Sequence, residues 1–570
     1  MAPGGTEKRE MAGRISRRAF LGWTALAAAA PALPTAHGAS RGGPGRQARG
    51  APSVIEGLGL EEATLAELQK GMAEGRFNAV HLLEMYVERI EALDRSGPGL
   101  RSILELNPEA EAAAAALDQE RREGRARGPL HGIPILLKDN IDTGDRMTTT
   151  AGSLALEGSA APRDATSAER LRRAGAVLLG KANMSEWANF RSSHSSSGWS
   201  SRGGQCLNPY ALDRSPCGSS SGSAIAVAAN LTAAALGTET DGSIVCPASS
   251  TGLVGIKPSL GLVSRAGVIP IAHTQDTVGP LARTVADAAL LLGALTGVDP
   301  RDPATSESQG KFQTDYTAYL DPDGLRGARI GVARAVYFGY HDETDAVVNR
   351  AIETMRGLGA TIVDPADIAT AKDMASGPEE LEVLEYEFKA DLDAYLASRG
   401  PGAPVRSLAD VIAYNESNAD RVMPWFGQDL LVASQAKGPL TDAAYRKALA
   451  AARRAARTRG LDAVLSKHRL DALVAPTAGP AFKIDLLNGD HFVGGSSTPS
   501  AMAGYPAVTV PAGSVRGLPV GVTFMGAAYA EPLLIRLAYA FEQATKARVA
   551  PRYPESVDPQ ARPCGGGAAA

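Results

Sequence analysis

Residues 216–223 form a run of glycine and serine that leads directly into an apolar stretch, and this junction restricts the fold more than any other feature. The run reads Pro-Cys-Gly-Ser-Ser-Ser-Gly-Ser, and residues 224–229 read Ala-Ile-Ala-Val-Ala-Ala. Small residues just before a buried helix allow backbone N–H groups to crowd around a ligand. We therefore predict a helix over 223–230. The preceding loop could serve a function or be a flexible linker, and composition alone leaves both open.

A second glycine-containing turn lies at residues 237–244, which read Gly-Thr-Glu-Thr-Asp-Gly-Ser-Ile. A serine that follows glycine in a tight turn, as Ser243 does, can present its hydroxyl where neighbouring backbone N–H groups converge. That is the geometry of an oxyanion hole. An ordinary strand-to-helix turn can have the same sequence, so this segment is not decisive by itself.

Lys138 follows the apolar run 133–137, which we predict to be a buried strand. Burial disfavours the charged form of a lysine, so Lys138 could act as a base. Alternatively, its side chain could extend out of the strand end and pair with Asp139.

The remaining apolar pattern predicts an α/β protein. No internal repeat and no internal linker divides the chain, so residues 57–553 are predicted to form a single large domain. Within this domain, the polar and irregular stretch 300–480 is predicted to be a variable region that covers the substrate. After the domain, residues 554–570 are predicted to form a disordered tail. Further strands are predicted at 176–179, 472–476, 507–511 and 520–524, and helices at 64–90, 107–122, 168–174, 285–295 and 533–544.

The first 39 residues resemble a targeting segment. Arg17 and Arg18 form a twin-arginine pattern ahead of the short apolar stretch 22–30, and small residues follow at 36–39. This pattern predicts a signal peptide at 1–39 and a flexible linker at 40–56, although a disordered Ala/Arg-rich tail would look similar. The apolar stretch is much shorter than the ~20 residues of a spanning helix. We therefore expect an exported protein, periplasmic or extracellular, that is not inserted in the membrane after signal removal.

Composition excludes several classes of function. The net charge is −4, from 58 basic and 62 acidic residues, which gives no sign of a nucleic-acid partner. The eight histidines and four cysteines form no metal-binding spacing, so we expect no metal and no cofactor.

Taken together, the three polar segments resemble the amidase-signature family. Ser243 lies 24 residues after Ser219, and the Lys138-Asp139-Asn140 segment lies upstream, in the order that this family shows. The resemblance covers about residues 57–545. Further segments that are similar to the family lie at 128–134, 173–177, 180–186, 252–258, 276–283 and 503–506.

The resemblance implies a single large domain with a twisted mixed β-sheet surrounded by helices. It also implies hydrolysis of a carboxamide C–N bond through an acyl-enzyme, with an amide substrate and water and without a cofactor. The roles that it implies are nucleophile for Ser243, bridging serine for Ser219, base for Lys138, supporting hydrogen bonds for Ser220, and oxyanion-hole N–H groups for Thr240, Asp241, Gly242 and Ser243.

Two departures bear on the substrate. Many family members have glycine where this chain has Asp241 and arginine where it has Val245. The form found here is most similar to bacterial peptide amidases, which remove the C-terminal amide nitrogen of peptide amides. A broad aliphatic or aryl amidase is the alternative. A glutaminase-type amidotransferase subunit shares the triad but conflicts with export, and a silent binding protein conflicts with the intact triad. The oligomeric state cannot be deduced from the sequence.

Several other side chains near these segments have two interpretations. Cys206, Cys217 and Cys246 are predicted to be small buried thiols, with a nucleophile or a Cys206–Cys217 disulfide as alternatives. His131 and His194 are predicted to be structural. The cluster Met423, Trp425 and Phe426 could line a pocket, but such a cluster is more often core.

Overall fold

The computed structural model describes residues 60–400 and 402–558. The predicted signal peptide and linker lie outside the described residues, as does most of the predicted tail. Within the described part, no helix is long and apolar enough to cross a bilayer.

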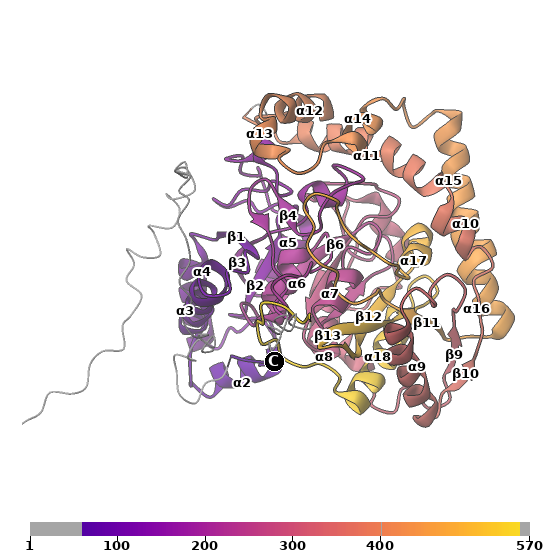
Figure 1. Cartoon of the computed structure of the whole chain (residues 1–570). Helices are drawn as coiled ribbons and strands as arrows, with labels where there is room; N and C mark the ends of the chain where they lie inside the picture. The colour runs from indigo at the N-terminus through magenta and orange to yellow at the C-terminus, as the bar shows by residue number, and fades with distance from the viewer. Residues whose placement is uncertain (1–59, 401, 559–570) are drawn as a thin grey trace, which may run out of the picture. The chain divides into compact units, whose positions relative to one another are not determined.

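An eleven-stranded mixed sheet runs through the described chain (Figure 1). Strands that neighbour one another in space come from distant parts of the sequence, which is why the sheet holds the two halves of the chain in one domain. In their order across the sheet, the strands are β1 (Ile103–Leu106), β3 (Val177–Ala182), β2 (Pro134–Lys138), β6 (Ala234–Glu239), β8 (Thr277–Ala282), β7 (Val254–Lys257), β12 (Ala507–Val515), β13 (Leu518–Met525), β11 (Ala472–Pro476), β9 (Arg329–Val332) and β10 (Thr361–Val363).

Parallel and antiparallel pairings alternate in blocks across the sheet. Strands β3, β2 and β6 are parallel neighbours, as are β11, β9 and β10. The strands between these two blocks pair antiparallel. The parallel block β3–β2–β6 places the carboxyl ends of β2 and β6 side by side, and these ends carry the segments singled out above.

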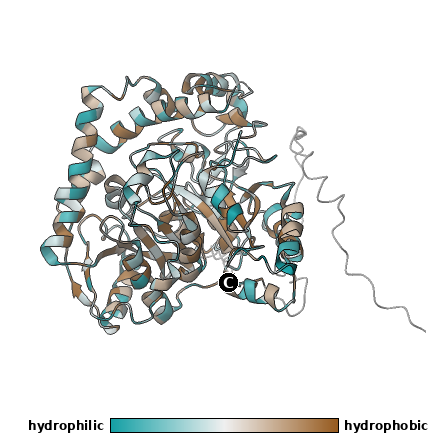
Figure 2. Ribbon diagram, turned by 180° about the vertical axis from the view of Figure 1, so that it is seen from behind, coloured by the Kyte–Doolittle hydropathy of each residue, from teal (hydrophilic) through white to brown (hydrophobic). Residues whose placement is uncertain are grey.

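The central strands are buried on both faces. Every residue of β2, β3, β6, β8, β11 and β13 is buried, whereas the edge strand β10 is partly exposed. Such strands have continuous apolar runs instead of alternation, because each face is covered. Figure 2 shows the apolar colour along these strands and a more polar mixture on the outer helices.

Helices cover both faces and one margin of the sheet. Helix α6 packs against β2, β3, β6 and β8; α8 packs against β7 and β8; α18 and α9 pack against β12 and β13. The helices are α2 (Leu65–Ala73), α3 (Ala79–Arg89), α4 (Ala110–Arg122), α5 (Thr166–Arg173), α6 (Ser221–Ala228), α7 (Val245–Ser250), α8 (Val285–Leu295), α9 (Asp342–Gly357), α10 (Ala371–Ser376), α11 (Glu379–Ser398), α12 (Leu408–Ser417), α13 (Ala419–Val422), α14 (Asp429–Gln435), α15 (Ala443–Ala456), α16 (Asp462–His468), α17 (Thr498–Ala503) and α18 (Glu531–Thr545).

Residues 300–480 do more than cover the core. This region contributes three strands of the sheet, β9, β10 and β11, before and after its helices. Between them, α11 to α15 run along the top and right of the view in Figure 1, away from α8 and α18. A small two-stranded ribbon, β4 (Trp199–Ser200) with β5 (Gly204–Gln205), completes the β structure of the described chain.

Some predicted elements match closely and others shift. Helix α8 and strand β11 have the predicted bounds, whereas α6 begins at Ser221, two residues earlier than predicted, inside the Gly/Ser run. The predicted tail boundary at 553 is placed too early, because backbone N–H groups at 212 and 213 donate to carbonyls at 554 and 555, and Asp558 pairs with Arg214. The predicted architecture of one large α/β domain with a mixed sheet surrounded by helices is confirmed.

Candidate active site

Lys138 is the last residue of β2, and its fully buried side chain reaches the Gly/Ser run. The Nζ atom lies 2.7 Å from the Ser219 Oγ, 2.8 Å from the Thr238 Oγ1 and 3.1 Å from the Thr238 carbonyl oxygen. A neutral amine has two N–H donors and one lone pair. In the structure the amine donates to the Ser219 hydroxyl and to both oxygens of Thr238; when Lys138 is neutral, its lone pair can instead accept from the Ser219 hydroxyl.

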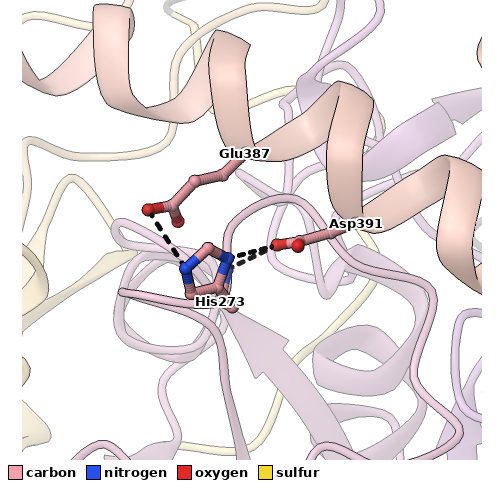
Figure 3. Close-up of side chains that lie close together, drawn as sticks. All are labelled: His273, Glu387 and Asp391. Carbon is pink, nitrogen blue, oxygen red and sulfur yellow. Dashed lines mark hydrogen bonds and ion pairs between the residues drawn. The ribbon is translucent and has the colours of Figure 1, made fainter. Parts of the chain in front are cut away.

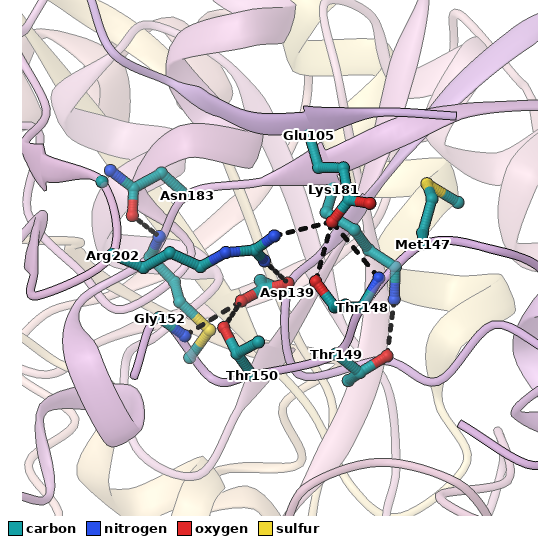
Figure 4. Close-up of polar contacts among 12 residues, drawn as sticks. Glu105, Asp139, Met147, Thr148, Thr149, Thr150, Gly152, Lys181, Asn183 and Arg202 are labelled. Carbon is teal, nitrogen blue, oxygen red and sulfur yellow. Dashed lines mark hydrogen bonds and ion pairs between the residues drawn. The ribbon is translucent and has the colours of Figure 1, made fainter. Parts of the chain in front are cut away.

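Burial also favours the neutral amine. It lowers the pKa of Lys138 to about 7, against the opposing effect of the buried Asp276 and Glu239. The alternative pairing with Asp139 does not occur, because Asp139 instead pairs with Arg202 and accepts from Thr150 and Gly152 (Figure 4). Lys138 is thus held in a buried position, and no carboxylate of the described residues forms an ion pair with it.

Figure 4 also shows a second buried lysine, Lys181, which sequence reasoning missed. Lys181 lies on β3 in register with Leu137 of β2, and its Nζ donates to Thr149 Oγ1 at 2.8 Å and to the Ile141 carbonyl. Lys181 therefore donates hydrogen bonds to acceptors in the loop that follows β2. In the described hydrogen-bond network, it does not contact either candidate serine. Its burial could not be recognised locally, because it is set by the strands on either side.

The Gly/Ser run is a tight loop, and the linker interpretation is wrong. The Gly218–Ser219 peptide is cis, and Ser219 is fully buried. Ser220 Oγ donates to the Thr238 carbonyl at 3.1 Å and accepts from the Thr238 N–H at 3.2 Å. Ser220 therefore ties the start of α6 to the end of β6, at the residue that also anchors Lys138.

Ser243 lies in the turn between β6 and α7. Gly242 has a φ of +83°, a left-handed conformation that favours glycine. The Glu239 carboxylate accepts from the N–H groups of Ile244 at 2.7 Å and Val245 at 3.0 Å. The Ser220 N–H donates to the Ser243 carbonyl at 3.2 Å, so the two serine-bearing segments are adjacent.

Side chains from other elements support the same turn. Thr240 Oγ1 donates to Asp276 at 2.6 Å, and Thr498 Oγ1 donates to Asp241 at 2.7 Å. Burial raises the pKa of Asp276 to about 6, partly offset by the hydrogen bonds that this carboxylate accepts. Sequence reasoning missed Glu239 and Asp276 as supports, because single buried carboxylates have no local signature.

A pocket of about 320 Å³ opens beside Ser243. Thr240, Asp241 and Gly242 also line it, and Leu384 of α11 contributes from the covering region. A concave site lined by apolar and polar side chains together is typical of small-molecule binding. Its other apolar or aromatic walls are Ala188, Phe190, Val245, Ile271 and Phe492, with Asp490 as a second acidic residue.

The aromatic cluster of 423–426 lies elsewhere. Phe426 packs edge-on against Trp199 and beneath Arg191, and none of Met423, Trp425 and Phe426 is among the described residues that line the pocket. His131 hydrogen-bonds the Leu117 carbonyl at 2.9 Å in the core, a structural contact. The Nδ1 atom of His194 lies 3.0 Å from the Oγ atom of Ser193, and both residues are exposed.

The prediction of small buried thiols is wrong for Cys217 and Cys246 and correct for Cys206, and the alternative Cys206–Cys217 disulfide does not occur. Cys217 and Cys246 form a disulfide, whereas Cys206 is a buried free thiol whose pKa is raised well above its usual value by burial. The partner of Cys217 is decided by the approach of α7 to the Gly/Ser loop. That approach depends on the packing of the loop against the end of β6, through the bonds of Ser220 to Thr238 and Ser243, which sequence spacing does not reveal.

One group of three potential metal ligands occurs among the described residues: His273, Glu387 and Asp391 (Figure 3). Asp391 accepts from the backbone N–H and the Nδ1 of His273, and Glu387 faces the Nε2 at 3.6 Å. Burial lowers the pKa of His273, but the two carboxylates outweigh it and raise the pKa above its usual value. The geometry is that of a histidine held between two carboxylates, which fastens α11 to the loop before β8.

The site can be compared with known proteins. A family model described as amidase matches residues 81–535. A protein named as a probable amidase in Arabidopsis thaliana is 42% identical over 502 residues, which cover 87% of this chain and 92% of that protein. A glutamyl-tRNA(Gln) amidotransferase chain from Chloroflexus aurantiacus is 36% identical over 496 residues, covering 85% of this chain and 97% of the relative.

Solved structures agree with the sequence relatives. The native peptide amidase from Stenotrophomonas maltophilia superimposes with a TM-score of 0.83 at 52% sequence identity, covering 86% of this chain and 99% of that one. The family match includes the Gly/Ser loop, the Ser243 turn and all eleven strands of the sheet. The chain therefore belongs to the amidase-signature family and is an amide-hydrolysing enzyme.

Proposed function

We propose that the protein is an exported peptide amidase that removes the C-terminal amide nitrogen of peptide amides, with Ser243, Ser219 and Lys138 as its triad. The observation that carries the triad is the buried contact of 2.7 Å between Lys138 Nζ and Ser219 Oγ. A pKa of about 7 leaves a large fraction of Lys138 neutral at neutral pH, as a base requires.

The reaction follows from this arrangement. Neutral Lys138 takes the proton of Ser219, and Ser219 takes the proton of Ser243, whose Oγ attacks the amide carbonyl. Backbone N–H groups of residues 240–243 stabilise the developing oxyanion. The relay then returns a proton to the leaving nitrogen, so that ammonia departs instead of an amide anion. Water repeats the cycle and releases the peptide acid.

The charge of the pocket supports an amide substrate. Among the described residues that line the pocket, none is basic, and Asp241 and Asp490 are acidic. A free carboxylate beside these groups would be repelled, whereas a neutral carboxamide would not. The similarity to a peptide amidase at 52% identity supports the narrower choice of peptide amides.

Ammonia release from a substrate panel tests the proposal. The purified enzyme, Ser243→Ala and the exposed control Ser306→Ala would be compared on C-terminal peptide amides, aliphatic and aryl amides, and glutamine. We expect release from peptide amides by the wild type and Ser306→Ala, and loss in Ser243→Ala by about 10³-fold or more. Activity confined to small or aryl amides, or to glutamine, would exclude the peptide-amide class. Equal activity in Ser243→Ala would exclude the nucleophile.

Export rests on the twin-arginine pattern at Arg17 and Arg18, outside the described residues. Cell fractionation with an R17K/R18K variant tests it. We expect the wild type outside the cytoplasm and the variant retained inside. Identical cytoplasmic distribution of both proteins would exclude this route.

A further inference from the structure

A disulfide joins the two segments that carry the candidate serines. Cys217 lies two residues before Ser219, and Cys246 lies three residues after Ser243. Their Cα atoms are 5.9 Å apart, although 29 residues separate them in sequence. The covalent bond therefore links the Gly/Ser loop to the first turn of α7.

The two half-cystines are themselves held close to the serines. Ser221 Oγ donates to the Cys217 carbonyl at 2.7 Å, which fixes the loop in which Cys217 has a left-handed φ of +61°. The Cys246 N–H donates to the Gly242 carbonyl at 2.8 Å, which closes the turn that contains Ser243. A shift of either cysteine would thus be passed to the adjacent serine.

Few other bonds connect the two segments directly. In the described hydrogen-bond network, the Ser220 N–H donates to the Ser243 carbonyl at 3.2 Å, and the Ser220 hydroxyl makes two further bonds to the Thr238 backbone at the end of β6. Proton transfer between Ser219 and Ser243 depends steeply on the separation of their hydroxyls, and a misplacement of about 1 Å can reduce a rate about 10²-fold. All three of these hydrogen bonds start from Ser220, and none involves the hydroxyl of Ser219 or Ser243, so they restrain the separation of the two hydroxyls only indirectly.

The disulfide also forms part of the pocket wall. Cys217 and Cys246 both line the pocket beside Ser243, pack against Ala478, and are each 7% exposed. A small thiol that enters the pocket can therefore reach the sulfur atoms without unfolding the domain. The free thiol Cys206 is fully buried, so it serves as an internal comparison.

We propose that the Cys217–Cys246 disulfide positions Ser219 against Ser243, so that full amidase activity requires the oxidised bridge. This inference rests on the proposed triad. In the reduced form, a dithiol has given two electrons and two protons to the bridge, the S–S bond has become two thiols, and the dithiol has become a cyclic disulfide. An oxidising exported location, as proposed above, would keep the bridge formed.

The test measures kcat and KM of the full-length purified enzyme before and after treatment with dithiothreitol, at a temperature where circular dichroism shows it folded. Thiol titration counts the bonds reduced. We expect kcat to fall about 10- to 100-fold with KM nearly unchanged, and to recover on reoxidation. A purely structural bridge would change thermal stability without this reversible fall in kcat.

Variants separate the alternatives. Cys217→Ser/Cys246→Ser should have the low kcat of the reduced enzyme with or without dithiothreitol, whereas Cys206→Ser should behave as wild type. Reduced, folded wild-type enzyme with unchanged kcat would overturn the positioning role, even if the double variant fails to fold. The Ser243→Ala variant distinguishes failure of the disulfide proposal from failure of the proposed triad. If Ser243→Ala stays active, the triad is wrong, whatever effect dithiothreitol has on the wild type.

Discussion

At the residue scale, the environment of Lys138 decides its chemistry. Its Nζ has three protein contacts, and Thr238 supplies two of them. Asn140 Nδ2 donates to the same Thr238 hydroxyl at 3.0 Å, which fixes the acceptor that orients the amine. A lysine placed in this way gives up a proton near neutral pH, whereas an exposed lysine does so near its ordinary pKa of 10.5.

The first prediction concerns pH. Below a pKa of about 7, Lys138 is protonated and cannot take the Ser219 proton, so kcat/KM should fall about tenfold per pH unit well below that value. Above it, kcat/KM should reach a plateau. Initial rates on a neutral peptide amide, from pH 5 to 9, give the profile.

The exposed variant Ser306→Ala should reproduce the wild-type profile, since it leaves Lys138 untouched. Lys138→Ala should lose about 10³-fold or more of kcat at every pH. A wild-type rate that is flat across pH 5–8, or one that rises only near pH 10, would show that Lys138 is not the base.

At the element scale, helix α6 requires close backbone approach at its start. A Cβ on Gly222 would collide with the Ser102 carbonyl oxygen and with the backbone of Asn183. The Gly222 N–H also donates to the Asn183 carbonyl at 2.9 Å. The small residues of the Gly/Ser run are therefore needed to bring α6 against the residues around β1 and β3, as well as to shape the site.

The second prediction is that Gly222→Ala destabilises the domain by about 3 kcal/mol, because backbone atoms cannot move aside as a flexible side chain would. Gly427→Ala is the matched control, since nothing lies within 4 Å of the added Cβ. Urea denaturation followed by circular dichroism measures both. Equal midpoints for the two variants would contradict the close-packing argument.

At the scale of the whole molecule, a buried arginine attaches the helical cover to the sheet domain. Arg191 is fully buried, pairs with Glu186 at 2.8 Å, and donates to the carbonyls of Val422 and Phe426. Its guanidinium also lies 4.1 Å from the Phe426 ring centroid. The connection between α13 and α14 is thus fixed on the loop that follows β3, close to the pocket residues Ala188 to Phe190.

The third prediction follows from that attachment. Arg191→Met should destabilise the protein by about 3–5 kcal/mol, because it leaves Glu186 buried without its charge partner. Arg191→Met/Glu186→Gln should recover part of this loss, since it removes the unpaired charge. Thermal or urea unfolding measures the stability of both variants. An Arg191→Met variant as stable as the wild type would show that Arg191 does not stabilise the attachment of the helical cover.

Sequence determined the elements whose signals are local. The apolar runs at 285–295 and 472–476 predict α8 and β11 with their observed bounds, because β11 is buried throughout and α8 is buried over most of its length. The junction at 216–230 predicts α6, the helix that begins within the Gly/Ser run. The roles of Lys138, Ser219 and Ser243 come from the resemblance to a family, since each segment alone allows an ordinary structural interpretation.

Tertiary structure decided what depends on residues far apart in the chain. Strand β8 escaped prediction because it contains Gly279 and Pro280, which are unfavourable in a central strand, and its pairing with β6 and β7 stabilises it there. The partner of Cys217, the burial of Lys181 and the supports Glu239 and Asp276 were likewise invisible. Strand order and helix docking create these contacts, and no local pattern of residue types encodes which distant side chains will meet.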